Sequence, residues 1–214
     1  MENSVVDFPT WIFPLDTFKA LPSFGSKEDN KTELIYRQSC AHMINYAGCR
    51  LKLTQLVSNT AIVFMHRFYM FQQMELFSPK DMAPVFLFLA TKIEEQLRYP
   101  KQILLAFNII KAPIETVPVK EIEENEKKLF INEKVLVQTL GFEFMINHPH
   151  IFIVKAMDVL KLQKEICQTA YFFASCSLHL TYFCVQLKSS YIAAICIKLA
   201  CMWSKRDVLC FGSK

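Results

Sequence analysis

Apolar residues recur at intervals of three and four along most of the chain, the spacing of an amphipathic helix. Between residues 34 and 45, for example, Leu34, Ala41 and Ile44 share one face, and the positions beside that face are polar. Glycine, which tight turns between strands usually require, occurs only four times in 214 residues. The pattern therefore predicts an all-α protein. Helices are expected over residues 31–48, 55–74, 79–94, 100–111, 119–140, 149–161, 164–185 and 189–203.

The helix predicted over 79–94 has the strongest start signal. Ser78 can cap its first turn, Pro79 suits the first helical position, and Asp81 complements the positive end of the helix dipole. The same segment raises a question at its other end, where the apolar run Phe86–Leu89 is followed within a few residues by Lys92 and two glutamates. A helix of this kind combines a core-forming body with a charged end.

The chain resembles itself at an offset of 110 residues. Without a gap, residues 54–90 lie over residues 164–200, and both the apolar positions and the helix breaks coincide. Two unrelated amphipathic helices can share a period, but the matching break favours a duplicated helical unit. We therefore expect an N-terminal extension over 1–30, a complete five-helix repeat over 31–141 and a second repeat over 142–214. The second repeat is expected to be truncated after about three helices and to leave an apolar patch exposed.

One stretch raises the possibility of a membrane span. No residue from Ile166 to Leu187 is formally charged, and that length can cross a bilayer. Polar side chains nevertheless interrupt it at positions 168, 169, 175, 177, 179, 181 and 186. A helix enclosed by neighbouring helices explains the stretch better, and the equivalent helix of the first repeat is also apolar nearly all round. We expect no membrane partner.

Charge and cysteine content reduce the number of function classes that the sequence allows. The net charge is +4 and the basic residues are scattered, so no electrostatic groove for nucleic acid is expected. The eight cysteines form no CxxC pair and His148–His150 stands alone, which predicts free thiols and no metal site. The N-terminus lacks a secretory signal, and no Gly-rich phosphate loop or hydrolase motif is present. The chain is therefore not expected to be an enzyme, and no cofactor is expected.

Several local motifs together resemble the cyclin box of transcriptional cyclins, most of all cyclin T, with cyclins K and L as weaker relatives. The resemblance extends from about Trp11 to the C-terminus. The motifs are YRQ (36–38), MHRFYM (65–70), LFLATKIEEQ (87–96), LVQTLGFEF (136–144), NHPH (147–150) and SLHLT (177–181). The resemblance implies the cyclin fold of two stacked five-helix repeats. It also implies a nuclear regulatory subunit that binds and activates a cyclin-dependent kinase acting on the RNA polymerase II tail, and so promotes transcription elongation.

The resemblance also implies a set of kinase-binding residues. Lys92 would hydrogen-bond backbone carbonyls of the kinase, and Glu133 would be its matching acid. The apolar and polar positions around this pair are Phe88, Phe142, Phe144 and Gln96. Arg37 and His66 are expected to be structural, as a buried hydrogen-bonding pair between the first two helices; other cyclins carry an acid at position 66, so no strong salt bridge is expected there.

Simpler interpretations of the same residues stay open at this point. Lys92 can merely favour the negative end of its helix. Glu133 can be surface charge, and Phe142 can belong to the core between the repeats. Phe86 and Phe88 lie two positions apart on a helix, so only one of them is expected to face a partner.

Two alternative functions also stay open. A helical scaffold of the general transcription factor type would need a basic groove, which the scattered charges do not supply. An inactive, truncated cyclin isoform is the other alternative, because the second repeat is expected to be incomplete.

Overall fold

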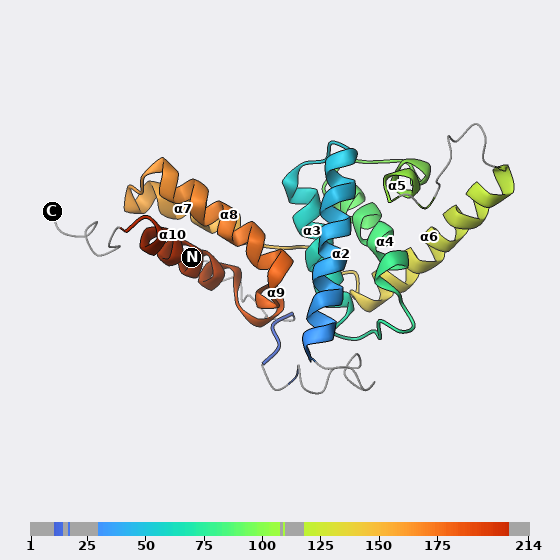
Figure 1. Cartoon of the computed structure of the whole chain (residues 1–214), viewed down its shortest axis with the longest axis horizontal. Helices are drawn as coiled ribbons and strands as arrows, with labels where there is room; N and C mark the ends of the chain where they lie inside the picture. Colours follow the sequence, from blue (N-terminus) through green and yellow to red (C-terminus); the bar gives the residue numbers. More distant parts are fainter. Residues whose placement is uncertain (1–10, 15–16, 18–29, 108, 110–117, 206–214) are drawn as a thin grey trace, which may run out of the picture. The chain divides into compact units, whose positions relative to one another are not determined.

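The computed structural model describes residues 11–14, 17, 30–107, 109 and 118–205, and every regular element among them is an α-helix (Figure 1). The prediction of an all-α protein is confirmed. The helices are α2 (Asn30–Arg50), α3 (Gln55–Phe68), α4 (Pro79–Ile93), α5 (Pro100–Ala106), α6 (Val119–Thr139), α7 (Pro149–Leu160), α8 (Lys164–Leu180), α9 (Phe183–Gln186) and α10 (Ser189–Trp203).

The described residues fall into two compact units. The N-terminal unit holds those within 20–146 together with Leu178–Thr181, and the C-terminal unit holds the remainder. The predicted N-terminal extension lies largely outside the described residues, and the boundaries predicted at 30 and 141 stay predictions. The offset of 110 residues is preserved in the structure, since α4 and α10 begin and end at positions separated by that number.

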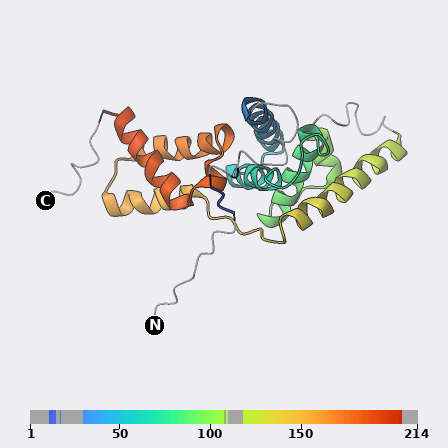
Figure 2. The same cartoon turned by 90° about the horizontal axis from the view of Figure 1, so that it is seen from below.

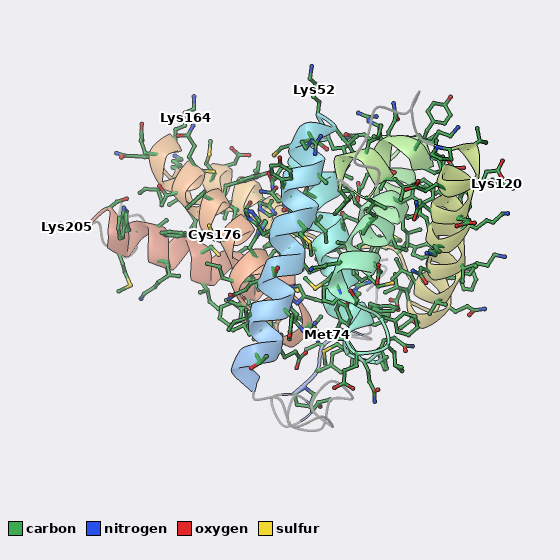
Figure 3. The ribbon with its side chains drawn as sticks, turned by 45° about the vertical axis from the view of Figure 1, so that its right-hand side comes forward. Lys52, Met74, Lys120, Lys164, Cys176 and Lys205 are labelled. Atoms are coloured by element: carbon green, nitrogen blue, oxygen red, sulfur yellow. The ribbon has the colours of Figure 1, made fainter. Side chains whose placement is uncertain are left out.

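Helix α4 is the central element of the N-terminal unit, with α2, α3, α5 and α6 packed against it. All its residues from Met82 to Thr91 are buried, and so are those of α3 from Val57 to Phe68. The ring of Phe68 makes edge-to-face contacts with Tyr69, Phe77 and Phe86, at centroid distances of 5.3–5.5 Å. This arrangement explains why the sequence of α3 is apolar nearly all round. Charged side chains mark the periphery, and Figure 3 shows Lys52 and Lys120 pointing outward.

The start of α4 follows the predicted chemistry. The Ser78 hydroxyl accepts a hydrogen bond of 3.2 Å from the Lys80 amide, Pro79 occupies the first turn, and Asp81 lies at the positive end. The helix therefore begins where its capping residues indicated, at the residue expected from the sequence.

In the C-terminal unit, α7, α8 and α10 lie side by side in both cartoon views (Figures 1 and 2). Their shared core consists of small and branched residues, including Ile153, Ile166, Ala170, Ile192 and Ala200. The expectation that α8 is enclosed is wrong, because Tyr171 is 41% exposed and Phe172 is 63% exposed. Within the described residues, no helix is long and apolar enough to cross a membrane.

Three helices are clearly shorter than the apolar period predicted, and α5, which ends at Ala106 instead of residue 111, is one of them. Helix α3 ends at Phe68 instead of residue 74, and the Arg37 guanidinium donates to the carbonyl oxygens of His66 and Tyr69 at that end. The helix expected over 164–185 is interrupted after Leu180, and α9 follows as a separate short helix. At the end of α8, the His66 imidazole and the Gln38 amide bond the carbonyl oxygens of Leu178 and Leu180. At the ends of α3 and α8, side chains from other helices thus take up carbonyl groups that a continuing helix would need.

Candidate functional site

The predicted pair of Lys92 and Glu133 is formed in the structure. Lys92 lies in the last turn of α4, and its Nζ is 2.7 Å from Oε1 of Glu133 on α6, 41 residues later in the chain. The Lys92 side chain is 37% exposed and that of Glu133 is 14% exposed. An ammonium group has three donors, so Lys92 retains donor capacity towards the solvent side.

The aromatic ring of Phe88 packs against the same ammonium group. Lys92 Nζ lies 4.1 Å from the ring centroid of Phe88, one turn earlier on α4, which is cation–π geometry. Phe88 itself is only 3% exposed, and Phe86 is fully buried. Both phenylalanines are thus buried in the free chain, and the expectation that only one of them faces a partner stays a prediction. With four helices packed against α4, Phe88 lies beneath Lys92, and its predicted direct contact with a partner stays a prediction.

The chain reverses directly after Lys92 through a turn that side chains fasten to α3. Glu94, the C-cap of α4, accepts a 2.7 Å hydrogen bond from the buried Thr60 hydroxyl. Glu95 has a φ of +55°, and Gln96 exchanges two hydrogen bonds with Thr54, one to its amide and one to its hydroxyl. Gln96 is thus engaged within the chain, and its contact with a partner stays a prediction. These bonds fix where the end of α4 points.

We expect Thr60→Val to loosen this turn. Valine keeps the shape of threonine but leaves the Glu94 carboxylate without the Thr60 donor, which costs about 1–2 kcal/mol of unfolding free energy. Amides of residues 94–96 should exchange with deuterium faster than in the parent, as hydrogen exchange read by mass spectrometry would reveal. Thr60→Ser, which restores the hydroxyl, is the control. Equal exchange in the valine variant and the parent would contradict the assignment.

The two aromatic positions after α6 differ in exposure. Phe142 is 70% exposed and follows Gly141 in the left-handed region, with φ of +61° and +59° respectively. Phe144 is half-buried and packs edge-on against Phe64 and Phe142, at 6.2 Å in both cases. Phe142 is therefore not part of the core of the N-terminal unit, and the alternative that it belongs to a core between the repeats stays open. A bulky residue with positive φ is strained, and such strain gathers at functional sites.

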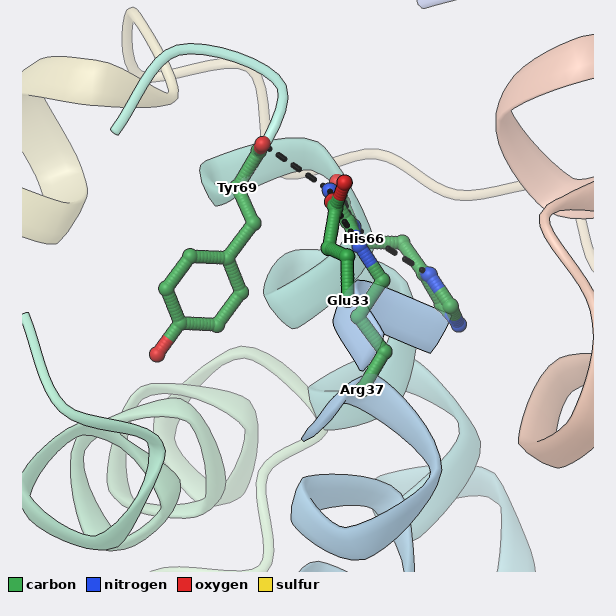
Figure 4. A network of polar contacts seen from close by, with 4 residues as sticks. All are labelled: Glu33, Arg37, His66 and Tyr69. Carbon is green, nitrogen blue, oxygen red and sulfur yellow. Dashed lines mark hydrogen bonds and ion pairs between the residues drawn. The ribbon is translucent and has the colours of Figure 1, made fainter. Parts of the chain in front are cut away.

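Arg37 and His66 form the expected buried pair, with a third member that sequence reasoning missed. Arg37 is fully buried, and its guanidinium donates to Glu33 Oε1 at 2.8 Å and to the carbonyl oxygens of His66 and Tyr69 at 2.9 Å each (Figure 4). Glu33 lies four positions before Arg37 on α2, a spacing that was legible in the sequence. The salt bridge of this cluster is thus made within α2, and His66 is the neutral neighbour.

The hydrogen bonds of His66 decide its tautomer. Its Nε2 lies 2.9 Å from the carbonyl oxygen of Leu178, so Nε2 carries the proton and Nδ1 faces the Arg37 guanidinium at 3.5 Å. Burial, and then the positive charge of Arg37, lower the pKa of His66 from 6.5 to about 3. His66 therefore stays neutral in the folded chain at neutral pH.

This neutral histidine makes stability depend on pH. Because the pKa of His66 is lower in the folded than in the unfolded chain, the unfolded chain binds the extra proton between about pH 6.5 and 3, and stability falls as the pH drops through that window. The variant His66→Gln keeps a donor for the Leu178 carbonyl oxygen but does not titrate. Between pH 7 and pH 5 we expect its free energy of unfolding to fall by about 2 kcal/mol less than that of the parent. Urea unfolding at both pH values provides the comparison. Equal losses would contradict the assigned state.

The described residues contain neither a candidate metal centre nor a disulfide. No group of three or more histidine, cysteine or acidic side chains in that part of the chain could hold a metal ion. Seven cysteines there are free thiols, in line with the prediction, while Cys210 lies outside the described residues.

Comparison with known proteins relates the chain to cyclins. Residues 17–145 match the family model described as "Cyclin, N-terminal domain", and residues 148–212 match "Cyclin-T2-like, C-terminal domain". The chain is 40% identical to Cyclin-T1 of Mus musculus over 201 residues and 42% identical to Cyclin-T of Drosophila melanogaster over 200 residues. These alignments cover 92% of the chain, but only 28% and 18% of the relatives. The chain thus spans less than a third of their length.

Solved structures with the same fold are much more distant in sequence. A chain of the yeast RNA Pol II CTD kinase CTDK-1 complex superposes with a TM-score of 0.80 at 16% identity, covering 92% of this chain and 64% of that one. A chain of the yeast TFIIK (Kin28/Ccl1/Tfb3) complex superposes with a TM-score of 0.69 at 17% identity, covering 98% and 95% respectively. These likenesses concern the fold.

Proposed function

Because the chain belongs to the cyclin family, we propose that it is a regulatory subunit that binds and activates a cyclin-dependent kinase. The proposed substrate of that kinase is the C-terminal tail of RNA polymerase II, the proposed role is in transcription elongation, and the proposed location is the nucleus. The similarity to cyclin T proteins and to a complex named as an RNA Pol II CTD kinase supports this choice.

The observation that carries the proposal is the Lys92–Glu133 pair at the end of α4. The Glu133 carboxylate and the Phe88 ring both contact the Lys92 ammonium group, which is partly exposed, so its remaining donor capacity is available to a partner. Backbone carbonyl oxygens of a kinase helix are acceptors that match such a donor, and a fixed charge pair sets the register of docking.

In this proposal the chain activates the kinase by fixing the position of one kinase helix. An active protein kinase requires a lysine and a glutamate of its own to pair beside ATP, and the glutamate lies on the helix that regulatory subunits position. A rigid platform whose anchoring residues are already fixed, as Thr60 and Thr54 fix the end of α4, can hold that helix inward at little entropic cost. In this proposal the kinase supplies all catalytic groups.

Co-expression with candidate cyclin-dependent kinases tests the proposal. We expect one kinase to co-purify with the chain as a stable pair, and the pair to phosphorylate a polymerase-tail peptide at least 10-fold faster than the kinase alone. Pairing without activation would support the alternative of a cyclin that binds only. The absence of any stable pair, or phosphorylation by the chain without a kinase, would overturn the proposal.

A further inference from the structure

A half-exposed aromatic ring adjoins the Lys92–Glu133 pair. Phe130 lies on α6 three residues before Glu133, so the two share one face of the helix, and Phe130 is 41% exposed. Its ring makes an edge-to-face contact with the ring of Phe88, at 6.0 Å between centroids and 63° between planes. Phe130 is thus connected to Lys92 through one shared buried ring.

Together these residues form what we call the Phe130–Lys92 patch, consisting of Phe88, Lys92, Phe130 and Glu133. Phe88 fills its centre, and Lys92 and Phe130 flank that ring as the two members with comparable exposure, 37% and 41%. The patch presents an apolar surface beside a cation with free donor capacity. A partner that fits it has an apolar side chain next to a hydrogen-bond acceptor, as a helix with exposed carbonyl groups has.

An exposed phenylalanine by itself needs no explanation, because folded proteins expose many apolar atoms. The neighbouring residue Ile131 is also exposed, but its surroundings differ from those of Phe130. Ile131 is even more exposed, at 60%, yet it lies about 100° further around α6 and lines a separate cavity of about 410 Å³ with Leu129 and Asn132. Phe130 is set apart by its direct contact with the ring that supports Lys92.

We propose that Phe130 is a contact residue of this platform, the apolar anchor that packs against the bound kinase beside the polar anchor at Lys92. The inference rests on the proposed function, since it names a further residue of the same docking surface. Aromatic side chains next to a desolvated polar contact are where interface binding energy concentrates. Phe130 would also shield the Lys92–Glu133 pair from water once the kinase is docked.

Affinity measurements on the kinase that co-purifies with the chain test this inference. We expect Phe130→Ala to raise the Kd about 10- to 50-fold, and Phe130→Leu, which still covers Phe88, to raise it about 5-fold. Ile131→Ala, the matched control on the same helix, should stay within about twofold of the parent. Thermal unfolding of each free variant separates lost contact from lost fold, and Kd is measured well below each Tm.

Lys92→Ala separates this inference from the proposed function. If Lys92→Ala leaves the Kd unchanged, the docking site itself is wrong and the inference falls with it. If Lys92→Ala weakens binding while both Phe130 variants bind within twofold of the parent, the inference is overturned and the proposed function stands. Should Phe130→Ala fail to fold, Phe130→Leu decides: an increase in Kd of more than twofold supports the inference, and a change within twofold overturns it.

Discussion

Alanine at both Lys92 and Glu133 is expected to weaken kinase binding about 30- to 1,000-fold, or 2–4 kcal/mol, while the helix content of the free chain stays unchanged. In the docked state both charges are removed from water, and losing them forfeits a charge-assisted contact and the register that it sets. In the free chain the pair is partly exposed, so its loss costs at most about 1 kcal/mol of stability. Calorimetric titration gives the affinity, and circular dichroism gives the helix content.

Lys134→Ala is the control for this experiment. Lys134 is exposed and adjoins Glu133 on α6, so its removal changes the net charge as Lys92→Ala does without touching the pair. We expect binding of this variant within about twofold of the parent. Parent-like affinity of the Lys92/Glu133 double variant would refute the assignment of the docking site.

Arg37→Met is expected to cause the largest loss of stability, about 3–5 kcal/mol. Methionine fills much of the same volume, but it leaves the buried Glu33 carboxylate without its guanidinium partner and withdraws the donors from the carbonyl groups of His66 and Tyr69. With native domains stable by 5–15 kcal/mol, this change approaches complete unfolding. The urea concentration at the unfolding midpoint measures the loss.

Two further variants locate the cause. Arg50→Met makes the same chemical change at the exposed end of the same helix, where the guanidinium donates one 3.2 Å hydrogen bond to the Ala106 carbonyl oxygen and no carboxylate is left buried, so it should cost only about 1 kcal/mol. Glu33→Gln combined with Arg37→Met removes both charges, and it should recover part of the loss because no uncompensated charge is then buried. A single Arg37→Met variant within 1 kcal/mol of the parent would show that the cluster is dispensable.

Some residues of the site can be predicted from the sequence, and others cannot. Glu33 and Arg37 stand four apart on α2, so their pairing is predictable from spacing alone, although the sequence analysis names only the arginine. Lys92 and Glu133 lie 41 residues apart, so no local pattern connects them, and only the resemblance to a family predicts the pair. Phe130 and Thr60 were missed, because an isolated phenylalanine or threonine in a helix carries no signal until its neighbours are known.

Local sequence signals are enough to predict that this protein is built from helices and where most of them begin. Apolar period, capping residues and scarcity of glycine act within a few residues, so they can be read along the chain, as at Ser78 and Pro79. Packing between helices sets the end of α3 at Phe68, the position of the Phe88 ring beneath Lys92 and the contact of Phe130 with that ring. Each of these depends on side chains from another helix, and which groups meet across helices is decided by packing in three dimensions.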